Sequence, residues 1–394
     1  MYYSWVEINL NILRENINII RENLSHNCQI LLPLKANAYG HGLEPMAKAA
    51  HEFGIEWLGL ATLREALEIK AYVPEARILV LGPCVADDVK ALCVHRITPI
   101  IVDLENALQL NSAAREMHIK LKCHIKVDTG MGRIGFNSEK NLNDIYKATQ
   151  LSNLEIEGLM SHYAGSDSED IRSSIGQLDR FKRVSKFLRE RDVNIPLKHI
   201  STSGGFLNIA HSDFDMVRPG ILLYGGLLPV DGKVRKGIRT KPMLMWKTNV
   251  TFVKEVFPGQ SIGYGSTFTA KKHTRIATIE IGYGDGFLRV LGNKGKILIR
   301  GDKFPVVGRI SMDQTTVDIG LHSSISVGDE VVLIGKQGFN EITINEIAEQ
   351  MNTIPYEVYT LISDRVERQY MFNGEQVHKF VFSNFGLMAE AILR

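Results

Sequence analysis

The chain contains 394 residues, a length that favours two domains over one. Hydrophobic residues make up 44% of it and charged residues 23%, and the net charge is +2, with lysines and arginines spread along the chain. This composition is ordinary for a globular protein and contains no basic block of the kind that binds nucleic acid. We therefore expect no nucleic-acid partner.

Signals for export or membrane insertion are missing from the sequence. The opening Met-Tyr-Tyr-Ser-Trp lacks the basic and then apolar regions of a secretory signal. No run reaches the roughly 18 consecutive apolar residues that a membrane-spanning helix needs. Four cysteines without C-x-x-C spacing are interpreted as thiols in a reducing compartment. We expect a cytoplasmic protein that does not associate with membranes.

Short apolar runs alternate with longer amphipathic segments up to about residue 225. Several runs are apolar throughout, which is typical of parallel strands covered on both faces. Segments such as 104–117 and 170–189 have apolar residues at helical spacing. The eight predicted strands are Gln29–Leu34, Glu56–Leu60, Arg77–Leu81, Ile97–Val102, Leu121–Val127, Glu155–Met160, Lys198–Ile200 and Asp215–Val217.

Eight strand–helix units predict a (β/α)₈ barrel, which we place at residues 1–235. An open, doubly wound sheet shows the same alternation and remains an alternative, because periodicity does not distinguish the two.

The pattern changes after Gly225. Residues 226–240 have the composition of a linker or exposed loop. Beyond them, short strand-like runs are separated by glycine-containing turns, and only 343–351 and 357–362 are predicted to be helical. We therefore predict a mainly β C-terminal domain at residues 236–394. Its predicted strands are Met245–Phe252, Arg275–Ile281, Lys296–Ile299, Thr315–Ile319 and Glu330–Ile334.

Polar and ionisable residues gather where the barrel strands end. Catalytic groups in such barrels come from the C-terminal ends of the strands and the loops that follow. These positions carry Lys35, Lys126, His162, Ser203 and Arg218. A purely structural barrel does not need this pattern, which indicates an active site; we predict no metal centre there.

Lys35 gives the most specific hypothesis. A lysine that follows an apolar strand is partly desolvated, which lowers its pKa and frees the amine for Schiff-base chemistry. Its position alone also fits an ordinary lysine that extends from a strand end to solvent. The loops after the seventh and eighth strands favour the first interpretation, because Ser203-Gly204 and Gly220-Ile221 offer a hydroxyl and backbone N–H groups to a phosphate.

Seven motifs in register resemble those of the alanine racemase family and cover almost the whole chain. They are Lys-Ala-Asn-Ala-Tyr-Gly-His-Gly (35–42), Lys-Val-Asp-Thr-Gly-Met-Gly-Arg (126–133), Arg-Pro-Gly-Ile-Leu-Leu-Tyr-Gly (218–225), Gly-Tyr-Gly-Ser-Thr-Phe (263–268), Gly-Tyr-Gly-Asp-Gly (282–286), Gly-Arg-Ile-Ser-Met-Asp-Gln (308–314) and Tyr-Glu (356–357). The resemblance implies a pyridoxal 5'-phosphate enzyme that interconverts L- and D-alanine and supplies D-alanine for peptidoglycan.

The resemblance also implies the roles of individual residues. Lys35 would bind the cofactor covalently and act as one catalytic base, and Tyr264 would be the base on the opposite face. Two bases are needed because racemisation removes the α-proton from one face and returns a proton to the other. The residues implied to hold the phosphate are Tyr39, Ser203, Gly220, Ile221 and Tyr356.

The other implied ligands surround the cofactor ring and the substrate. His162 would lie beside the ring, Arg218 would face the pyridine nitrogen, and Arg133 would face the phenolic oxygen. Met312 would bind the substrate carboxylate through its backbone N–H. Arginine stays protonated and only donates hydrogen bonds, so the ring nitrogen next to Arg218 should stay unprotonated. The resulting weaker electron sink selects proton exchange over transamination and decarboxylation.

Lys126 is predicted to be carbamylated, as the matching lysine is in many relatives. An unmodified Lys126 beside Arg133 would put two cations together, which is the physical motive for the modification. Since Tyr264 and Met312 lie in the β domain, the resemblance further implies a head-to-tail homodimer in which each active site is completed by the partner chain.

The sequence departs from the family pattern at two places. Thr202-Ser203-Gly204-Gly205 stands where relatives usually have Asn-Ser-Ala-Ala, and Gly284 stands where alanine is common. The glycines predict a more mobile turn and a looser wall, which would admit serine or a larger substrate. A racemase of broader specificity is therefore an alternative.

Two other classes compete with a racemase. Barrel-type amino-acid decarboxylases share the cofactor, but they use an acidic residue at the pyridine nitrogen and a cysteine from the second domain. Here the first position carries Arg218, and no cysteine follows Cys123. A non-enzymatic cofactor carrier would need neither a second base nor a β domain.

Overall fold

The computed structural model describes residues 4–25, 27–226, 237–321, 324–377, 380–383 and 386–389. It divides into two compact units, which are described separately. The barrel unit consists of residues 14–38 and 43–240, and the β unit of residues 1–13, 39–42 and 241–394. Most of the predicted linker, 227–236, lies outside the described residues.

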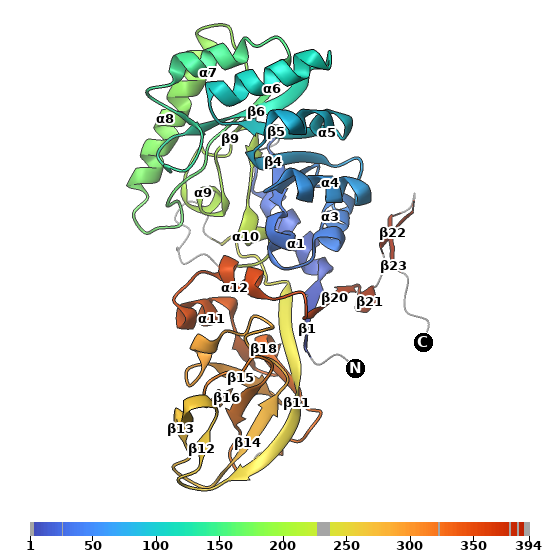
Figure 1. The fold of residues 1–394 in the computed structure, drawn as a ribbon, viewed down its shortest axis with the longest axis vertical. Coiled ribbons are helices and arrows are strands. Elements are labelled where there is room, and N and C mark those ends of the chain that lie inside the picture. Colours follow the sequence, from blue (N-terminus) through green and yellow to red (C-terminus); the bar gives the residue numbers. More distant parts are fainter. Residues whose placement is uncertain are drawn as a thin grey trace. The chain divides into compact units, whose positions relative to one another are not determined.

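Eight parallel strands form the sheet of the barrel unit (Figure 1). Their spatial order is β10-β2-β3-β4-β5-β6-β8-β9, and the short strand β7 pairs with β6. The first and last strands are joined by a hydrogen bond from the Arg218 N–H to the Ser201 carbonyl (2.9 Å) and by a parallel bridge between Thr202 and Arg218. The sheet therefore closes into a ring, as the sequence predicts, and the open doubly wound alternative is wrong. The strands are β2 (Gln29–Pro33), β3 (Trp57–Leu60), β4 (Arg77–Pro83), β5 (Ile97–Ile101), β6 (Leu121–Asp128), β7 (Phe136–Asn137), β8 (Leu154–Met160), β9 (Leu197–His199) and β10 (Met216–Val217).

Helices follow most of these strands, and their sequences explain where they begin. The Thr62 side chain accepts a hydrogen bond from the N–H of Glu65, whose carboxylate returns to the Thr62 N–H, so a capping box starts α4. Asp103 caps α6 in a similar way. The helices of this unit are α1 (Leu10–Glu22), which begins in the β unit, α3 (Leu43–Glu52), α4 (Leu63–Tyr72), α5 (Val89–Val94), α6 (Leu104–Glu116), α7 (Leu142–Thr149), α8 (Arg172–Arg189), α9 (Ser203–Asn208) and α10 (Gly220–Leu223), with one 3₁₀ turn η1 (Ala86–Asp88).

Large apolar side chains fill part of the barrel interior. One cluster joins Leu31, Trp57, Leu79, Ile100 and Met160, all from strands and all at most 3% exposed. Burial of this apolar surface is the main favourable term in folding the unit, and it holds the strand ends in fixed positions.

The β unit is built on a long antiparallel sheet with β11 at its centre. Strand β1 pairs with β11 and, in parallel, with β20, so the first strand of the chain belongs to this sheet and not to the barrel. The strands are β1 (Ser4–Asn9), β11 (Leu244–Val256), β12 (Ser261–Ile262), β13 (Phe268–Thr269), β14 (Thr274–Ile279), β15 (Lys296–Ile299), β16 (Asp302–Pro305), β17 (Thr315–Asp318), β18 (Glu330–Gln337), β19 (Asn340–Ile342), β20 (Glu367–Phe372), β21 (Glu375–Val377), β22 (Phe380–Ser383) and β23 (Gly386–Ala389). The helices are α11 (Ile344–Met351) and α12 (Pro355–Leu361), with 3₁₀ turns η2 (Tyr264–Ser266) and η3 (Arg289–Leu291).

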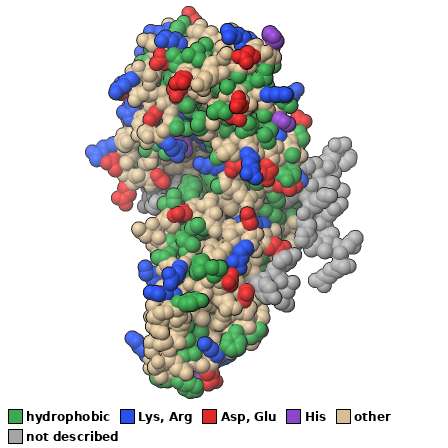
Figure 2. Space-filling view, viewed as in Figure 1, with side chains coloured by type: hydrophobic (Ala, Val, Ile, Leu, Met, Phe, Trp, Pro, Cys, Tyr) green, Lys and Arg blue, Asp and Glu red, His purple; other side chains and the backbone are tan. Residues whose placement is uncertain are grey.

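Surface charge agrees with the composition. Figure 2 shows lysines and arginines interspersed with aspartates and glutamates on the visible face. Among the described residues, none of the helices combines the length and apolar character needed to cross a bilayer. The same part of the chain contains no cluster of three or more His, Cys, Asp or Glu side chains placed to hold a metal ion.

Candidate active site

Four cationic side chains meet around the C-terminal ends of the barrel strands. Lys35 follows β2, Lys126 lies near the end of β6, Arg218 follows β10, and Arg133 lies in the loop between β6 and β7. Arg133 and Arg218 both lower the pKa of Lys35 and of Lys126, which places the four charges within electrostatic reach of each other. The rim therefore attracts anions.

Lys35 begins a short segment with unusual backbone geometry, labelled α2 (Lys35–Tyr39). Ala36, Asn37 and Ala38 have φ of 53° to 54°, the left-handed region, which costs about 1–2 kcal/mol per non-glycine residue. Polar contacts hold the turn: the Ala36 N–H donates to Glu65 Oε1 (2.9 Å) and the Asn37 carboxamide accepts from the Leu43 N–H (2.8 Å). Such strain is typical of functional sites, and here it fixes the direction in which Lys35 leaves the strand.

The Lys35 amine is poised for nucleophilic chemistry. Burial lowers its pKa from the ordinary value, and the charges of Arg133 and Arg218 lower it further, against a smaller opposing effect of Glu65. This confirms the desolvation inferred from its place after an apolar strand. A larger fraction of the amine is neutral than in an exposed lysine.

Arg218 is 4% exposed and makes no ion pair within the described part of the chain. Its guanidinium donates to the carbonyls of Ser161 (2.6 Å) and Ile200 (3.2 Å) and to His199 Nδ1 (2.6 Å). His162 Nδ1 lies 3.5 Å from Nη2 of the same guanidinium. Burial lowers the pKa of Arg218 to about 10, so the side chain stays cationic at neutral pH.

The positive charges nearby lower the pKa values of Lys126 and His162. Burial, Arg218 and Arg133 together lower the pKa of Lys126 to about 7, and Asp128 offsets the effect only partly. The pKa of His162 lies well below its usual value because of burial and the charges of Arg218 and Lys126. At neutral pH His162 is therefore neutral, and Lys126 gives up its proton more readily than an exposed lysine does.

The loops after β9 and β10 form two neighbouring helix starts. The Ser203 hydroxyl accepts a hydrogen bond from the Leu222 N–H (3.2 Å), which joins the first turn of α9 to that of α10. The N–H groups of Gly204 and Ile221 lie in these first turns, where a helix provides no acceptor of its own. The hydroxyl, the amides and the cationic surroundings are suited to bind a phosphate, and we call this group the phosphate cradle.

The two glycines of this cradle lie in close-packed surroundings. A Cβ on Gly204 would lie 2.8 Å from the backbone of Ser166 and Asp167, and one on Gly205 would lie 2.8 Å from the Tyr163 ring. Both glycines are buried. Close packing of neighbouring groups therefore explains them.

In the β unit, Tyr264 is presented by a tight turn. Gly263 and Gly265 flank it with φ of 74° and 70°, values that residues other than glycine rarely adopt. The Tyr264 side chain is 68% exposed. The turn packs on Arg309, since a Cβ on Gly265 would lie 2.8 Å from Arg309 Nη1.

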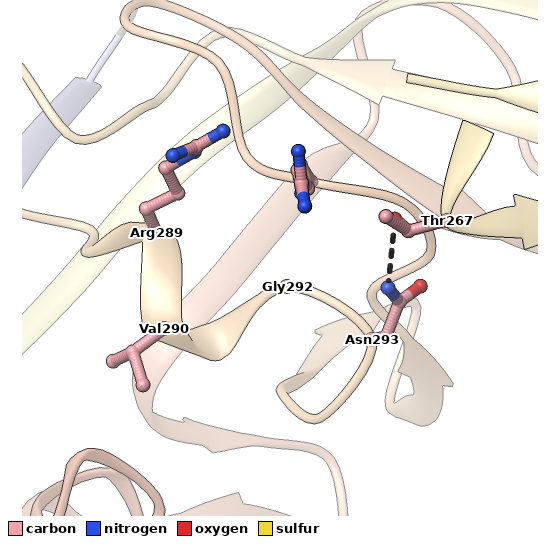
Figure 3. A pocket seen from close by; sticks show the side chains of 6 residues that line it. Thr267, Arg289, Val290, Gly292 and Asn293 are labelled. Carbon is pink, nitrogen blue, oxygen red and sulfur yellow. Dashed lines mark hydrogen bonds between the residues drawn. The ribbon is translucent and has the colours of Figure 1, made fainter. Parts of the chain in front are cut away.

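A hollow of about 400 Å³ adjoins this turn (Figure 3). Thr267 and Asn293, which both line it on one side, are joined by a hydrogen bond of 3.1 Å. Arg289 and Arg309 contribute two cations to its lining. The surface near Tyr264 is thus also suited to anions.

Tyr39 and Tyr356 lie together in the β unit, with ring centroids 5.6 Å apart in an edge-on arrangement. Tyr39 is 6% exposed, and burial raises the pKa of its hydroxyl, with a further contribution from Tyr356. The Tyr39 phenol therefore keeps its proton at neutral pH and can donate a hydrogen bond.

Met312 lies in a loop fastened to the turn that contains Tyr283 and Gly284. Tyr283 N–H donates to the Ser311 carbonyl (3.1 Å) and Gly284 N–H to the Met312 carbonyl (2.9 Å). With its carbonyl directed at the turn, Met312 can present its own N–H on the other side of the loop. Its side chain is 53% exposed.

Arg365 binds two aspartates of the same region and occupies the space beside Gly284. Its guanidinium donates to Asp313 Oδ1 (2.8 Å) and lies 3.3 Å from Asp285 Oδ1. A Cβ on Gly284 would lie 2.5 Å from Arg365 Nη1 and 3.1 Å from the Met312 carbonyl. The space beside this glycine is taken by neighbouring groups, so Gly284 does not widen the wall.

We expect Gly284→Ala to lower the free energy of unfolding by only about 1 kcal/mol, because the overlapping atom is the far end of the half-exposed Arg365 side chain, which can move aside at the cost of its contact with Asp285. Urea denaturation of the variant measures the change. In an Arg365→Ala background the same substitution should cost less, because the overlapping group is gone. Equal costs in the two backgrounds would contradict this explanation.

Several supporting residues were not predicted from the sequence. Gln177 on α8 donates to the His162 carbonyl (3.0 Å) and to Thr129 Oγ1 (3.3 Å), and so ties the loops of β6 and β8 together. Arg180 donates to the Thr129 carbonyl (2.6 Å). The only available signal was a glutamine on the apolar face of a predicted helix, which points to a buried polar contact but not to its partner.

The chain has the architecture of a (β/α)₈-barrel enzyme, with a partly desolvated lysine and two neighbouring helix starts at the barrel rim, together with a mainly β unit. Two family models match the chain, "Alanine racemase, N-terminal domain" at residues 8–228 and "Alanine racemase, C-terminal domain" at residues 243–370. The chain belongs to the alanine racemase family.

Individual relatives agree along nearly the whole chain. Alanine racemase of Halothermothrix orenii is 41% identical over 367 residues, which cover 93% of this chain and 96% of the relative. The structure of alanine racemase from Clostridium difficile 630 matches with a TM-score of 0.90 at 36% identity, covering 96% of this chain and 98% of that one. Alanine racemase from Bartonella henselae, solved with covalently bound pyridoxal phosphate, matches with a TM-score of 0.84 at 28% identity over 94% of this chain and 100% of that one.

Proposed function

We propose that this protein interconverts L- and D-alanine with pyridoxal 5'-phosphate as cofactor, and that it supplies D-alanine for peptidoglycan. Membership of the alanine racemase family supports the reaction and the cofactor. The observation that carries the assignment to this site is the group of four cations at the barrel rim, in which Lys35 has a lowered pKa and Arg218 pairs with no carboxylate of the described residues.

The residues present fit the cofactor. Its phosphate suits the cradle of Ser203, Gly220 and Ile221. The family motifs that contain Tyr39 and Tyr356 assign two further phosphate ligands to these tyrosines. Its aldehyde requires an amine that is neutral part of the time, as Lys35 is. When bound, the cofactor withdraws electrons from the substrate's α-carbon and so acidifies its α-proton.

Two side chains would then move protons at the α-carbon. Lys35 Nζ would exchange a proton on one face and Tyr264 Oη on the other, since simple inversion needs one group on each side. His162 lies beside the cation cluster and would flank the cofactor ring. Arg133 would face the phenolic oxygen of the cofactor. The Met312 N–H would bind the carboxylate of the substrate.

Arg218 would face the pyridine nitrogen as a permanent donor. Its contacts are carbonyls and imidazole nitrogens, and none of them supplies a proton to that nitrogen. The decarboxylase alternative requires an acid at this place, so the observed surroundings favour a racemase.

We also propose a homodimer in which the partner chain completes each site. Tyr264 and Met312 are 68% and 53% exposed in the single chain, unusually open for groups that must exclude water during catalysis. A cytoplasmic location is part of the same proposal, supported by four cysteines that are all free thiols.

Lys126 is proposed to carry a carbamate. A neutral amine attacks CO₂ to form Lys–NH–COO⁻ and releases one proton, and a pKa of about 7 makes that amine available at physiological pH. The product replaces a buried cation next to Arg218 and Arg133 by an anion, which relieves repulsion.

We expect activity to rise with added bicarbonate above about pH 7 and to respond little below it, because Lys126 is protonated there. Intact-protein mass spectrometry under bicarbonate should show the added mass of one CO₂. Lys126→Ala should lose activity and regain part of it with acetate. Full activity of Lys126→Ala without acetate would contradict the carbamate.

A polarimetric screen tests the function as a whole. Purified protein with pyridoxal phosphate is incubated with L-alanine, L-serine and L-lysine, and loss of optical rotation is followed. We expect L-alanine to racemise fastest. Faster reaction of serine would favour the broader racemase, and release of CO₂ without racemisation would favour the decarboxylase.

A further inference from the structure

A row of buried polar groups crosses the barrel interior from Arg218 to its N-terminal side. Arg218 Nη1 lies 2.6 Å from His199 Nδ1, and His199 Nε2 lies 2.9 Å from His124 Nδ1. His124 Nε2 in turn lies 3.7 Å from Glu157 Oε1, which is beyond hydrogen-bond length. Both histidines are 0% exposed.

The far end of the row is anchored by a carboxylate. Glu157 is 7% exposed and lies on β8. Its Oε1 accepts from Thr98 Oγ1 (3.0 Å) and its Oε2 from Arg77 Nη2 (3.1 Å). Burial alone would raise the pKa of Glu157, but contacts with His124, Thr98 and Arg77 hold it below the ordinary value, so this group is ionised at neutral pH.

Hydrogen-bond chemistry fixes the direction of the whole row. Arginine only donates, so His199 Nδ1 must accept and its Nε2 must carry the proton. His124 Nδ1 therefore accepts as well, and the proton on His124 Nε2 points at the carboxylate of Glu157, which only accepts. Every N–H points from Arg218 toward Glu157.

The same geometry prevents either histidine from taking a second proton. A proton on His199 Nδ1 would face the Arg218 donor at 2.6 Å, and one on His124 Nδ1 would face the His199 donor at 2.9 Å. Burial, Arg218, His124 and Lys126 lower the pKa of His199 far below its usual value. Burial also lowers the pKa of His124, with Arg77 and Arg218 acting in the same direction and Glu157 against it.

We propose that His199, His124 and Glu157 act as a positioning relay for Arg218. The two neutral histidines orient the guanidinium with a neutral acceptor. Glu157, whose carboxylate also pairs with Arg77 (3.1 Å) and Lys122 (3.9 Å), supplies the countercharge at the opposite end of the row. Arg218 is thus held in place without an acid beside it, and so without a proton source near the group that it faces. The identity of the group that Arg218 faces rests on the proposed function. The contacts within the relay do not depend on that function.

Gly158 shows that the interior is shaped around the relay. It pairs with His124 across β6 and β8, and a Cβ at this position would overlap the imidazole ring. The Trp57 ring packs against the same imidazole in a tilted arrangement, at a centroid distance of 5.5 Å. The histidine therefore occupies a site built for it.

Nitrogen-15 NMR of the unmodified protein without cofactor tests the relay directly. We expect two histidines in the neutral Nε2–H tautomer from about pH 5 to pH 8, with a scalar coupling across the His199 Nε2–H to His124 Nδ1 hydrogen bond. Titration of either histidine in this range, or an Nδ1–H tautomer, would overturn the proposal. This measurement needs no variant to fold and no activity.

A matched pair of variants tests the part of Glu157. Glu157→Gln removes the countercharge, and Glu155→Gln removes an exposed carboxylate two residues earlier on the same strand. We expect Glu157→Gln to lower kcat by roughly tenfold with little change in KM for alanine, since supporting contacts of this kind are worth about 10–100-fold. Glu155→Gln should leave both constants unchanged. An unchanged kcat in Glu157→Gln would contradict the role of Glu157 as countercharge. An unmodified protein without racemase activity would instead contradict the proposed function, and the NMR result would not be affected.

Discussion

Replacing Lys35 by alanine is expected to abolish the covalent attachment of pyridoxal phosphate and to reduce racemase activity by about four orders of magnitude or more. The loss combines two roles, because general-base catalysis alone contributes about 10²–10⁴-fold and the attachment point disappears as well. The folded protein should remain about as stable, since the deleted amine is a desolvated group whose protonation burial and Arg133 already disfavour.

Activity, absorbance of the bound cofactor and urea denaturation together check this result. Methylamine should restore part of the activity of Lys35→Ala by supplying an amine in the vacated space. Lys90→Ala, on the barrel helix α5, is a suitable control that should behave like the unmodified protein. Retained covalent attachment in Lys35→Ala would show that another lysine holds the cofactor.

Replacing Tyr264 by phenylalanine is expected to separate the two halves of the reaction. The variant keeps the ring but loses the hydroxyl, so proton exchange should fall by about 10²–10⁴-fold on the face that Tyr264 serves. Lys35 should continue to exchange the α-proton of the other enantiomer with solvent. Because the two enantiomers have equal free energy, kcat/KM for racemisation must fall equally in both directions.

The informative measurement is therefore exchange of the α-proton with deuterium, followed by NMR for each enantiomer separately. Tyr283→Phe, in the second Gly-Tyr-Gly turn, is the matched control and should change neither exchange rate by much. Similar exchange of L- and D-alanine in Tyr264→Phe would mean that Tyr264 is not a base.

Most of the architecture could be predicted because its signals are local. All eight barrel strands were expected within one or two residues of their observed ends, since buried parallel strands are short apolar runs between helices. Helix α8, predicted at 170–189, begins at Arg172. Strand β1 was missed because Ser4–Asn9 joins a sheet whose other strands lie more than 230 residues away, and no local pattern records that pairing.

The candidate active-site residues of the barrel could be proposed from the sequence because each of them directly follows a predicted strand. Lys35, Arg218 and Ser203 all lie at the ends of barrel strands, and the structure places them at the same rim of the barrel. The left-handed turn after Lys35 was not predictable, because Ala36 and Ala38 favour right-handed conformations and only tertiary contacts hold them otherwise. His124 and His199 lie 75 residues apart, and their hydrogen bond follows from barrel closure and not from spacing.

Borohydride reduction of the holoenzyme, followed by peptide mapping, tests the central claim most directly. Reduction converts a bond between a lysine amine and the cofactor into a stable secondary amine, which marks the residue that held it. We expect one labelled peptide, containing Lys35, and loss of racemase activity in step with labelling. A label on Lys126 or on any other lysine, or full labelling with activity retained, would contradict it.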